Sequence, residues 1–89
     1  MFKRLHISYV QKQLYTYSNA TYLKHLALSL GLKGYYHQNQ QQIEIEVEGK
    51  NNSINEFLNF IEKDEDIEEL FIQSLDELKG FETFTINMI

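Results

Sequence analysis

The side chains best suited to hold a ligand lie in the first half of the chain. All six tyrosines occur there, and several fall in or beside one polar-aromatic segment, residues 11–20. The candidate binding residues of that segment are Lys12, Tyr15, Thr16, Tyr17, Ser18 and Asn19. Tyrosine rings can stack on a ligand or anchor a protein partner, because each has an apolar body and a polar hydroxyl. Ordinary packing in the core and at its rim would explain the same tyrosines.

Other reactive arrangements are missing from the sequence. Cysteine is absent, and the three histidines, His6, His25 and His37, are too scattered to form a local ligand pair, so no metal site and no cofactor is expected. No serine stands in the GxSxG pattern of a hydrolase nucleophile. The acidic cluster at residues 64–69 lacks the glycine and the spacing of a calcium loop, so a solvated acidic face is the simpler interpretation.

The charges are divided unevenly along the chain, whose net charge is −5. Residues 1–42 carry five basic side chains and no acid, whereas all 13 acids lie from residue 43 onward. The acidic excess disfavours nucleic acid, which needs clustered cations, although the first half could hold a small anion. No apolar run approaches the roughly 20 residues that span a bilayer. Without cysteine or a signal-peptide pattern, we expect a cytoplasmic protein that does not bind membranes.

Alternating hydrophobic residues predict the strands that position these side chains. The expected strands are residues 2–10, 35–38, 42–48, 67–75 and 81–89. In residues 42–48 the isoleucines and the valine would face the core, while Glu44, Glu46 and Glu48 would face solvent. The last strand would be an exposed edge of the sheet.

Two helices are expected between these strands. The first would be capped by Ser18 or Asn19 and would end at a glycine. The second would start at a capping box that runs from Ser53 to Glu56. The order is βαββαβ with a terminal strand, which predicts an α+β, ferredoxin-like split βαβ sandwich with both helices on one face of a mostly antiparallel sheet. We expect a single domain over residues 1–89.

Four stretches resemble the acylphosphatase family in order and spacing. They are LGLKGY at residues 30–35, IEIEVEG at residues 43–49, FL at residues 57–58 and FETFTI at residues 81–86. The chain is similar to acylphosphatases over nearly its whole length, and the resemblance implies their fold. In that family a loop of sequence VQGVGFR holds the phosphate of a carboxyl-phosphate anhydride with backbone N–H groups and an arginine, and no metal takes part in the hydrolysis.

The loop residues that carry this chemistry in the family are replaced here. Counting back from Leu30 without gaps puts the family's arginine at Ala20. Matching the literal Val10 and Gln11 puts it at Thr16 instead. Neither register supplies an arginine or any of the loop glycines.

The family's water-orienting asparagine corresponds to Gln38, and Asn39 stands next to it. Glutamine is one methylene longer, which displaces an oriented water by about 1 Å or more, and catalysis by positioning is sensitive to such a shift. Lys12 lies near the loop, but a lysine is a point charge rather than a planar fork. No catalytic residue is therefore expected.

Three functions remain open on this scaffold. In the first, residues 11–20 bind an unknown protein or a small anionic ligand, and the chain is a binding or interaction module. In the second, the chain is a divergent acylphosphatase in which Gln38 or Asn39 orients water beside a displaced cation. In the third, it is a regulatory domain that senses a small molecule. A monomer or a weak dimer is expected.

Overall fold

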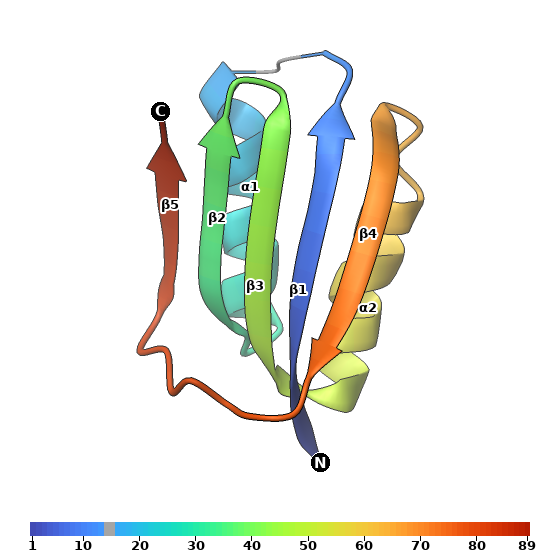
Figure 1. Cartoon of the computed structure of the whole chain (residues 1–89). Coiled ribbons are helices and arrows are strands. Elements are labelled where there is room, and N and C mark those ends of the chain that lie inside the picture. Colours follow the sequence, from blue (N-terminus) through green and yellow to red (C-terminus); the bar gives the residue numbers. More distant parts are fainter. Residues whose placement is uncertain (14–15) are drawn as a thin grey trace.

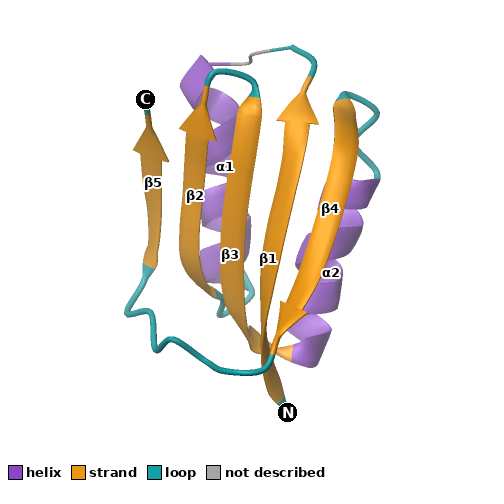
Figure 2. Ribbon diagram, in the orientation of Figure 1, coloured by secondary structure: helices purple, strands orange, loops and turns teal. Residues whose placement is uncertain are grey.

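The computed structural model describes residues 1–13 and 16–89, and the side chains of residues 1–13 and 19–89. The elements are β1 (Phe2–Gln11), α1 (Thr16–Ser29), β2 (Lys33–Asn39), β3 (Gln42–Lys50), α2 (Asn51–Glu62), β4 (Ile67–Leu75) and β5 (Phe84–Met88). The strands form one sheet in the order β4-β1-β3-β2-β5, and both helices cover the same face of it (Figure 1; Figure 2). The predicted α+β, ferredoxin-like arrangement with a terminal strand is confirmed.

β1 lies between β4 and β3, next to the β4 edge of the sheet, and pairs antiparallel with both. β2 and β3 form an antiparallel hairpin. β5 joins the sheet on the other side of β2 and runs parallel to it. Because β4 and β5 lie at opposite edges, the connection between them, residues 76–83, crosses from one edge of the sheet to the other (Figure 1).

The core lies between the sheet and the two helices. Ile7 of β1 and Ile45 of β3 pair directly, and neither has any exposed surface. α2 contributes Ile54, Phe57 and Ile61, whose spacing of three and four places them on one face of the helix. Burying one such side chain stabilises the fold by roughly 1.5–3 kcal/mol. The alternation in the strands and the stripe on α2 therefore determine which face of the sheet is covered.

Both helices begin earlier than the sequence predicts. α1 begins at Thr16, before the predicted cap. α2 begins at Asn51, directly after β3, and Lys50 occupies its N-cap position without a side-chain hydrogen bond. The predicted capping box at Ser53 is therefore wrong. The backbone N–H of Asn51 donates instead to the carbonyl of Met1 at 3.0 Å, so a distant part of the chain satisfies one of the donors at the start of the helix.

β5 lies at the edge of the sheet as predicted, but it is shorter than residues 81–89. The backbone N–H groups of Lys79, Gly80 and Phe81 donate to the carboxylate of Glu48, at 2.7, 2.9 and 3.0 Å. Because these N–H groups donate to a side chain of β3, residues 79–81 do not extend β5, which starts at Phe84.

Two glutamates of β3 are buried, although the alternation predicts that they face solvent. Glu46 and Glu48 keep only 6% and 7% of their surface exposed, whereas Glu44 is half-buried. All three lie on the sheet face away from the helices, but neighbouring segments cover the first two. The prediction that Glu46 and Glu48 face solvent is therefore wrong.

The hairpin between β2 and β3 turns at Gln40 and Gln41, and Gln40 has a φ of 56°. This left-handed conformation costs a residue with a Cβ roughly 1–2 kcal/mol, whereas glycine adopts it freely. Because Gln40 is exposed, we expect Gln40→Gly to raise the free energy of unfolding by about 1 kcal/mol in urea titrations. Gln40→Ala, which keeps a Cβ at the same position, is the control. A gain from Gln40→Ala as large as that from Gln40→Gly would contradict this explanation.

Candidate functional site

The end of β1 and the residues after it are held by Asp66. The side-chain amide of Gln11 donates to Asp66 Oδ2 at 2.8 Å, and the backbone N–H of Gln13 donates to the same oxygen at 3.0 Å. The backbone N–H of Lys12 donates to the Asp66 carbonyl at 2.9 Å. Gln11 is buried, so its amide needs such a partner. The turn that precedes β4 is thereby fastened to the turn that follows β1.

Lys12 is exposed, and its ammonium group lies 3.9 Å from Glu68 Oε1. Both side chains are about half exposed, so solvent screens the pair and it contributes less than about 1 kcal/mol. The carbonyl of Lys12 accepts a hydrogen bond from the side-chain amide of Gln41 at 2.9 Å. The lysine nearest to the predicted loop is therefore beside a carboxylate.

The predicted binding segment lies partly outside the described residues. Tyr15 is outside them, and Thr16, Tyr17 and Ser18 form the start of α1 with side chains that also lie outside the described part. Asn19 is half-buried and lines a small cavity bordered by β1, α1 and α2. Of the predicted binding residues, Lys12 and Asn19 are thus the two whose side chains the structure places.

Next to Asn19, α1 contributes both a core residue and an exposed aromatic. Ala20, the arginine position in the gap-free register, has no exposed surface and packs in the core. Tyr22 is 54% exposed and stacks on Phe60 of α2, which is 42% exposed, with ring centroids 5.0 Å apart and an interplanar angle of 26°. Exposed aromatic side chains of this kind are frequent anchors in protein interfaces.

The amide of Gln38 is used within the protein. The hydroxyl of Tyr36 donates to Gln38 Oε1 at 2.9 Å, and Gln38 Nε2 donates to the carbonyl of Gln40 at 3.1 Å. Burial raises the pKa of Tyr36 to about 12, so its hydroxyl keeps its proton at neutral pH. Gln38 is buried, whereas Asn39 beside it is exposed. The two residues predicted to orient water therefore differ in exposure, and the buried one has internal partners for both ends of its amide.

On the face of the sheet away from the helices, Glu46 is the centre of a polar cluster. The Tyr35 hydroxyl donates to Glu46 Oε2 at 3.0 Å, and His6 Nδ1 lies 3.2 Å from the same oxygen. Arg4 Nε lies 3.5 Å from Glu46 Oε1, within the range of an ion pair but without the geometry of a hydrogen bond. The strand register brings the cluster together, because His6 and Tyr35 are the direct partners of Glu46 on the two neighbouring strands.

The pKa of Glu46 is lowered, although burial opposes this. Burial is the largest single influence and favours the protonated acid, but the hydrogen bonds from Tyr35 and His6 and the charges of Lys79 and Arg4 together outweigh it. Burial and the hydrogen bond to Glu46 also raise the pKa of Tyr35 to about 12. At neutral pH the cluster therefore holds an ionised carboxylate beside a protonated phenol.

We expect the protein to lose stability as the pH falls through the lowered pKa of Glu46. A carboxyl group whose pKa is lower in the folded than in the unfolded state stabilises the fold above its unfolded value, about 4.3, and loses that effect as the pH falls toward the folded value. Glu46→Gln removes this contribution. Urea unfolding between about pH 5 and about pH 3 should therefore show a smaller loss of stability in the variant than in the parent. Equal losses in the two proteins would contradict the assignment.

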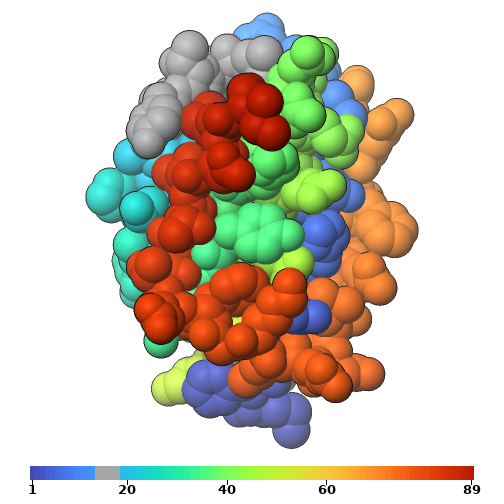
Figure 3. Space-filling model, turned by 60° about the vertical axis from the view of Figure 1, so that its left-hand side comes forward, coloured from blue at the N-terminus to red at the C-terminus, as the bar shows by residue number. Residues whose placement is uncertain are grey.

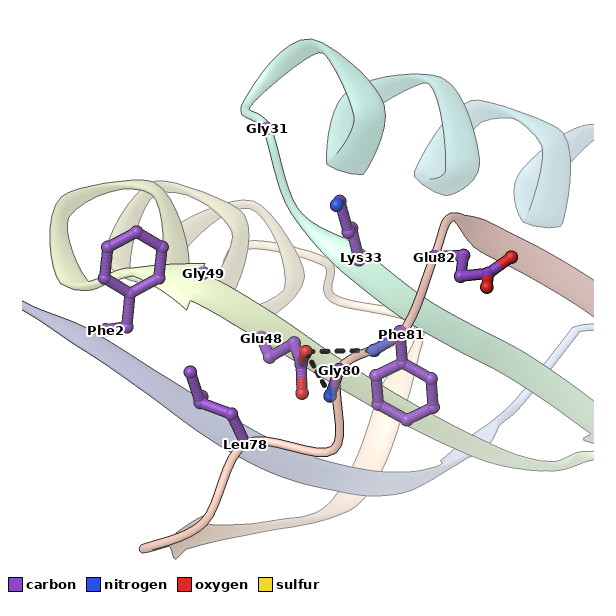
Figure 4. Close-up of a pocket in the computed structure, with 9 residues that line it drawn as sticks. All are labelled: Phe2, Gly31, Lys33, Glu48, Gly49, Leu78, Gly80, Phe81 and Glu82. Atoms are coloured by element: carbon purple, nitrogen blue, oxygen red, sulfur yellow. Dashed lines mark hydrogen bonds between the residues drawn. The ribbon is translucent and has the colours of Figure 1, made fainter.

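A cavity of about 360 Å³ lies under the connection between β4 and β5 (Figure 4). Phe2, Leu78 and Phe81 supply large apolar side chains to its lining, and Lys33 supplies a cation. Glu48 also lines the cavity, but its carboxylate accepts the three backbone hydrogen bonds of the connection. Successive backbone N–H groups that converge in this way form an anion-binding nest, which is filled here by a side chain of the protein itself.

The sequence matches the acylphosphatase family over residues 10–86. The chain belongs to this family. Acylphosphatases from Bacillus subtilis and Coxiella burnetii share its fold, with TM-scores of 0.78 and 0.82 at 18% and 12% sequence identity. Each alignment covers 97% of this acylphosphatase-family chain. The alignments cover 98% of the Bacillus subtilis chain and 93% of the Coxiella burnetii chain. No curated protein sequence matches the chain.

Larger proteins contain the same fold as one part. Full-length HypF, in its phosphate- and nucleotide-bound form, aligns with a TM-score of 0.83 and 21% identity over 99% of this chain, but over only 12% of its own. A bacterial light-regulated adenylyl cyclase aligns with a TM-score of 0.83 and 11% identity over 100% of this chain and 29% of its own. At these identities the likeness shows a common fold alone. The acylphosphatase-family chain thus spans a small part of some of the structures that it matches.

Within residues 1–13 and 16–89, no group of three or more histidine or acidic side chains is placed to hold a metal ion. His6, one of the histidines weighed as a ligand, is hydrogen-bonded to Glu46 instead. In the same described part of this acylphosphatase-family chain, no helix is both long enough and apolar enough to cross a bilayer.

Sequence reasoning missed both buried glutamates of this acylphosphatase-family sheet. A signal for Glu46 was present, because an antiparallel pairing of the first strand with residues 42–48 would set His6 and a carboxylate side by side. Glu48 had no comparable signal. Its partners are backbone N–H groups of residues 79–81, more than 30 positions away in the sequence, and any residue type supplies such donors.

Proposed function

We propose that this chain does not hydrolyse acyl phosphates and works as a binding module for a protein partner. The observation that carries the proposal is the occupation of the donors at the end of β1. The amide of Gln11 and the backbone N–H of Gln13 both donate to Asp66 Oδ2, an internal carboxylate oxygen. In the register through Val10 and Gln11 these residues belong to the phosphate loop, which needs such donors free. Asp64, which lines the cavity beside Gln11, adds negative charge that repels an anion.

The position of α1 supports the view that the phosphate-binding arginine is absent, whichever of the two registers is used. The two registers differ by four residues, which is close to one helical turn. Because α1 begins at Thr16, the register through Val10 and Gln11 assigns the arginine position to the junction of loop and helix, where the family's arginine would be needed. The gap-free register assigns it to Ala20, which is buried in the core and cannot present a side chain to solvent. Neither position supplies a guanidinium group.

The environment of Gln38 supports the loss of the water-orienting group. Its Oε1 accepts from Tyr36 and its Nε2 donates to Gln40, so releasing either end for water breaks an internal hydrogen bond. A typical intramolecular hydrogen bond contributes about 1 kcal/mol to the free energy of unfolding. Leaving a buried donor or acceptor without a partner costs more. Asn39 is exposed and free of that constraint, but it points away from the buried face on which Gln38 lies, because successive residues of a strand alternate in direction.

The binding surface that we propose comprises residues 11–20, part of which lies outside the described residues, together with the exposed pair Tyr22 and Phe60. Lys12 is exposed there, and the two stacked rings offer apolar area in a rigid arrangement. Rigid aromatic side chains lose little conformational freedom on binding, which suits a protein interface. The lack of cysteine fits a cytoplasmic setting for such a partner.

Titration with inorganic phosphate tests the proposal. In a ¹⁵N-labelled sample we expect no saturable chemical-shift change at the backbone N–H groups of Gln11, Lys12 and Gln13, because they already donate to the carbonyl of Gln41, the carbonyl of Asp66 and the carboxylate of Asp66, respectively. Sodium chloride at equal ionic strength is the control. Saturable shifts confined to these residues would show that the end of β1 still holds an anion, and would contradict the proposal.

A second function, the sensing of a small molecule, is favoured by the cavity under the β4–β5 connection. Its volume of about 360 Å³ falls within the range of ligand pockets, and most of its lining surface is apolar. A ligand that binds only the folded state raises the apparent stability. Thermal-shift measurements with a set of metabolites test this function, and the variant Leu78→Asp, which places a charge in the exposed lining, should abolish any shift that arises there.

A further inference from the structure

Among the residues that the structure describes, no hydrogen bond reaches the backbone groups on the outer edge of β5. In the parallel ladder with β2, Gly34 donates to the carbonyl of Thr83 at 3.0 Å, and Ile89 donates to the carbonyl of Gln38 at 2.9 Å. Alternate residues of a strand direct their N–H and C=O groups to the same side. The groups of Thr85 and Asn87 therefore face β2, and those of Phe84, Ile86 and Met88 face away from the sheet.

The two edges of the sheet differ in how they are protected. β4 has a bulge opposite β1 at Glu69, which has a φ of 54°, and it carries the acidic residues Glu68 and Glu69. Bulges and charges are the usual devices that keep an edge strand from pairing with another chain. β5 reads Phe-Thr-Ile-Asn-Met and has neither a charge nor a proline. Figure 3 shows this segment, in red, along the surface of the molecule beside α1.

We propose that β5 pairs antiparallel with β5 of a second copy of this chain, with a twofold axis at Ile86. The three outward residues are spaced symmetrically about Ile86, so Phe84 meets Met88 of the second copy and Ile86 meets its own equivalent. Each of these pairs exchanges two backbone hydrogen bonds. β5 can pair with a second β5 without electrostatic repulsion, because residues 84–88 carry no charged side chain. The nearest acidic residue, Glu82, lies outside the paired segment. The two sheets then join into one continuous sheet.

The side chains of β5 fit this pairing on both faces. Ile86 and Met88 pack against the core and are only partly buried, so a neighbouring strand would cover apolar surface that is exposed in the single copy. Thr85 and Asn87 are exposed on the opposite face. In the proposed register Thr85 stands directly opposite Asn87 of the second copy, in a non-hydrogen-bonded pair where side chains are closest.

Charge substitutions at these two exposed positions test the register. In T85K/N87K each lysine faces a lysine of the second copy, and in T85E/N87K each glutamate faces a lysine. By sedimentation across a wide range of concentration, we expect the unmodified chain to dimerise weakly. We expect T85K/N87K to raise the dissociation constant about tenfold or more, whereas T85E/N87K keeps or strengthens the dimer. An equal mixture of T85K/N87K with T85E/N87E should restore association that neither variant shows alone.

Two results would overturn the inference. One is an unmodified chain that stays monomeric at the highest concentration reached, which would leave the edge to a different partner or to none. The other is a T85K/N87K variant that dimerises as well as the parent, which would place any interface elsewhere. Both variants alter exposed side chains and no ladder hydrogen bond, and circular dichroism with thermal unfolding checks that each is folded. The outcome does not depend on whether the end of β1 binds a partner.

Discussion

Gly34→Ala is expected to destabilise the protein by about 4 kcal/mol, which removes most of the stability of a small domain. Gly34 has a φ of 150° in β2, and a Cβ at this position would lie 1.8 Å from the backbone oxygen of Glu46 and 3.1 Å from the Cα of Val47. Both atoms belong to the backbone of β3, so no flexible side chain can move aside. The clash separates β2 from β3 where β5 also joins the sheet, because the Gly34 N–H donates to Thr83.

Gly31→Ala is the matched control for this substitution. Gly31 also has a positive φ, 73°, but a Cβ there would have nothing within 4 Å. We expect it to cost only the conformational strain of about 1–2 kcal/mol. Urea unfolding of the two variants separates strain from contact. If Gly31→Ala and Gly34→Ala lowered the free energy of unfolding equally, the close contact between Gly34 and the backbone of β3 would not explain the effect.

Glu48→Ala is expected to cost about 3 kcal/mol and to loosen β5 before the rest of the sheet. The substitution removes the acceptor of three backbone N–H groups, those of Lys79, Gly80 and Phe81. Hydrogen bonds to an ionised group contribute more than neutral ones, but water can partly replace the carboxylate at this exposed connection. Hydrogen exchange should therefore speed up most at the N–H groups of residues 85 and 87, which bind β2.

Two further variants define the cause of that loss. Glu48→Gln keeps the shape and one acceptor oxygen, so it should cost about half as much as Glu48→Ala. Glu44→Ala removes a half-buried glutamate from the same face of the same strand and should cost less than about 1 kcal/mol. If Glu44→Ala destabilised the protein as much as Glu48→Ala, the three hydrogen bonds would not be the reason for the effect.

The fold could be predicted because its signals are local. The alternation of Ile43, Ile45 and Val47 specifies a strand with one buried face, and the stripe of Ile54, Phe57 and Ile61 specifies an amphipathic helix. Motifs in the order of the acylphosphatase family agreed with these patterns. The starts of the helices were harder, because the first donor of α2 is satisfied by the carbonyl of Met1 and not by a capping side chain.

The burial and the hydrogen-bond partners of the polar side chains could not be predicted in the same way. Alternation shows that Glu46 and Glu48 leave the core face, but their burial depends on strands and a connection that come from elsewhere in the chain. The replaced loop could be read from the sequence because a missing arginine is visible without a structure. That Asp66 occupies the donors of Gln11 and Gln13 depends on a contact across more than 50 positions, which no local pattern reveals.

Hydrolysis of benzoyl phosphate tests the central claim most directly, namely that this member of the acylphosphatase family has lost the family's chemistry. With a highly purified sample, we predict that the rate of benzoyl phosphate hydrolysis equals that in buffer alone. This rate should not rise with protein concentration. The variants Gln38→Ala and Asn39→Ala should give the same rate as the parent. A rate that rises in proportion to protein and falls in either variant would contradict the account, because it would show a working acylphosphatase site at the end of β2.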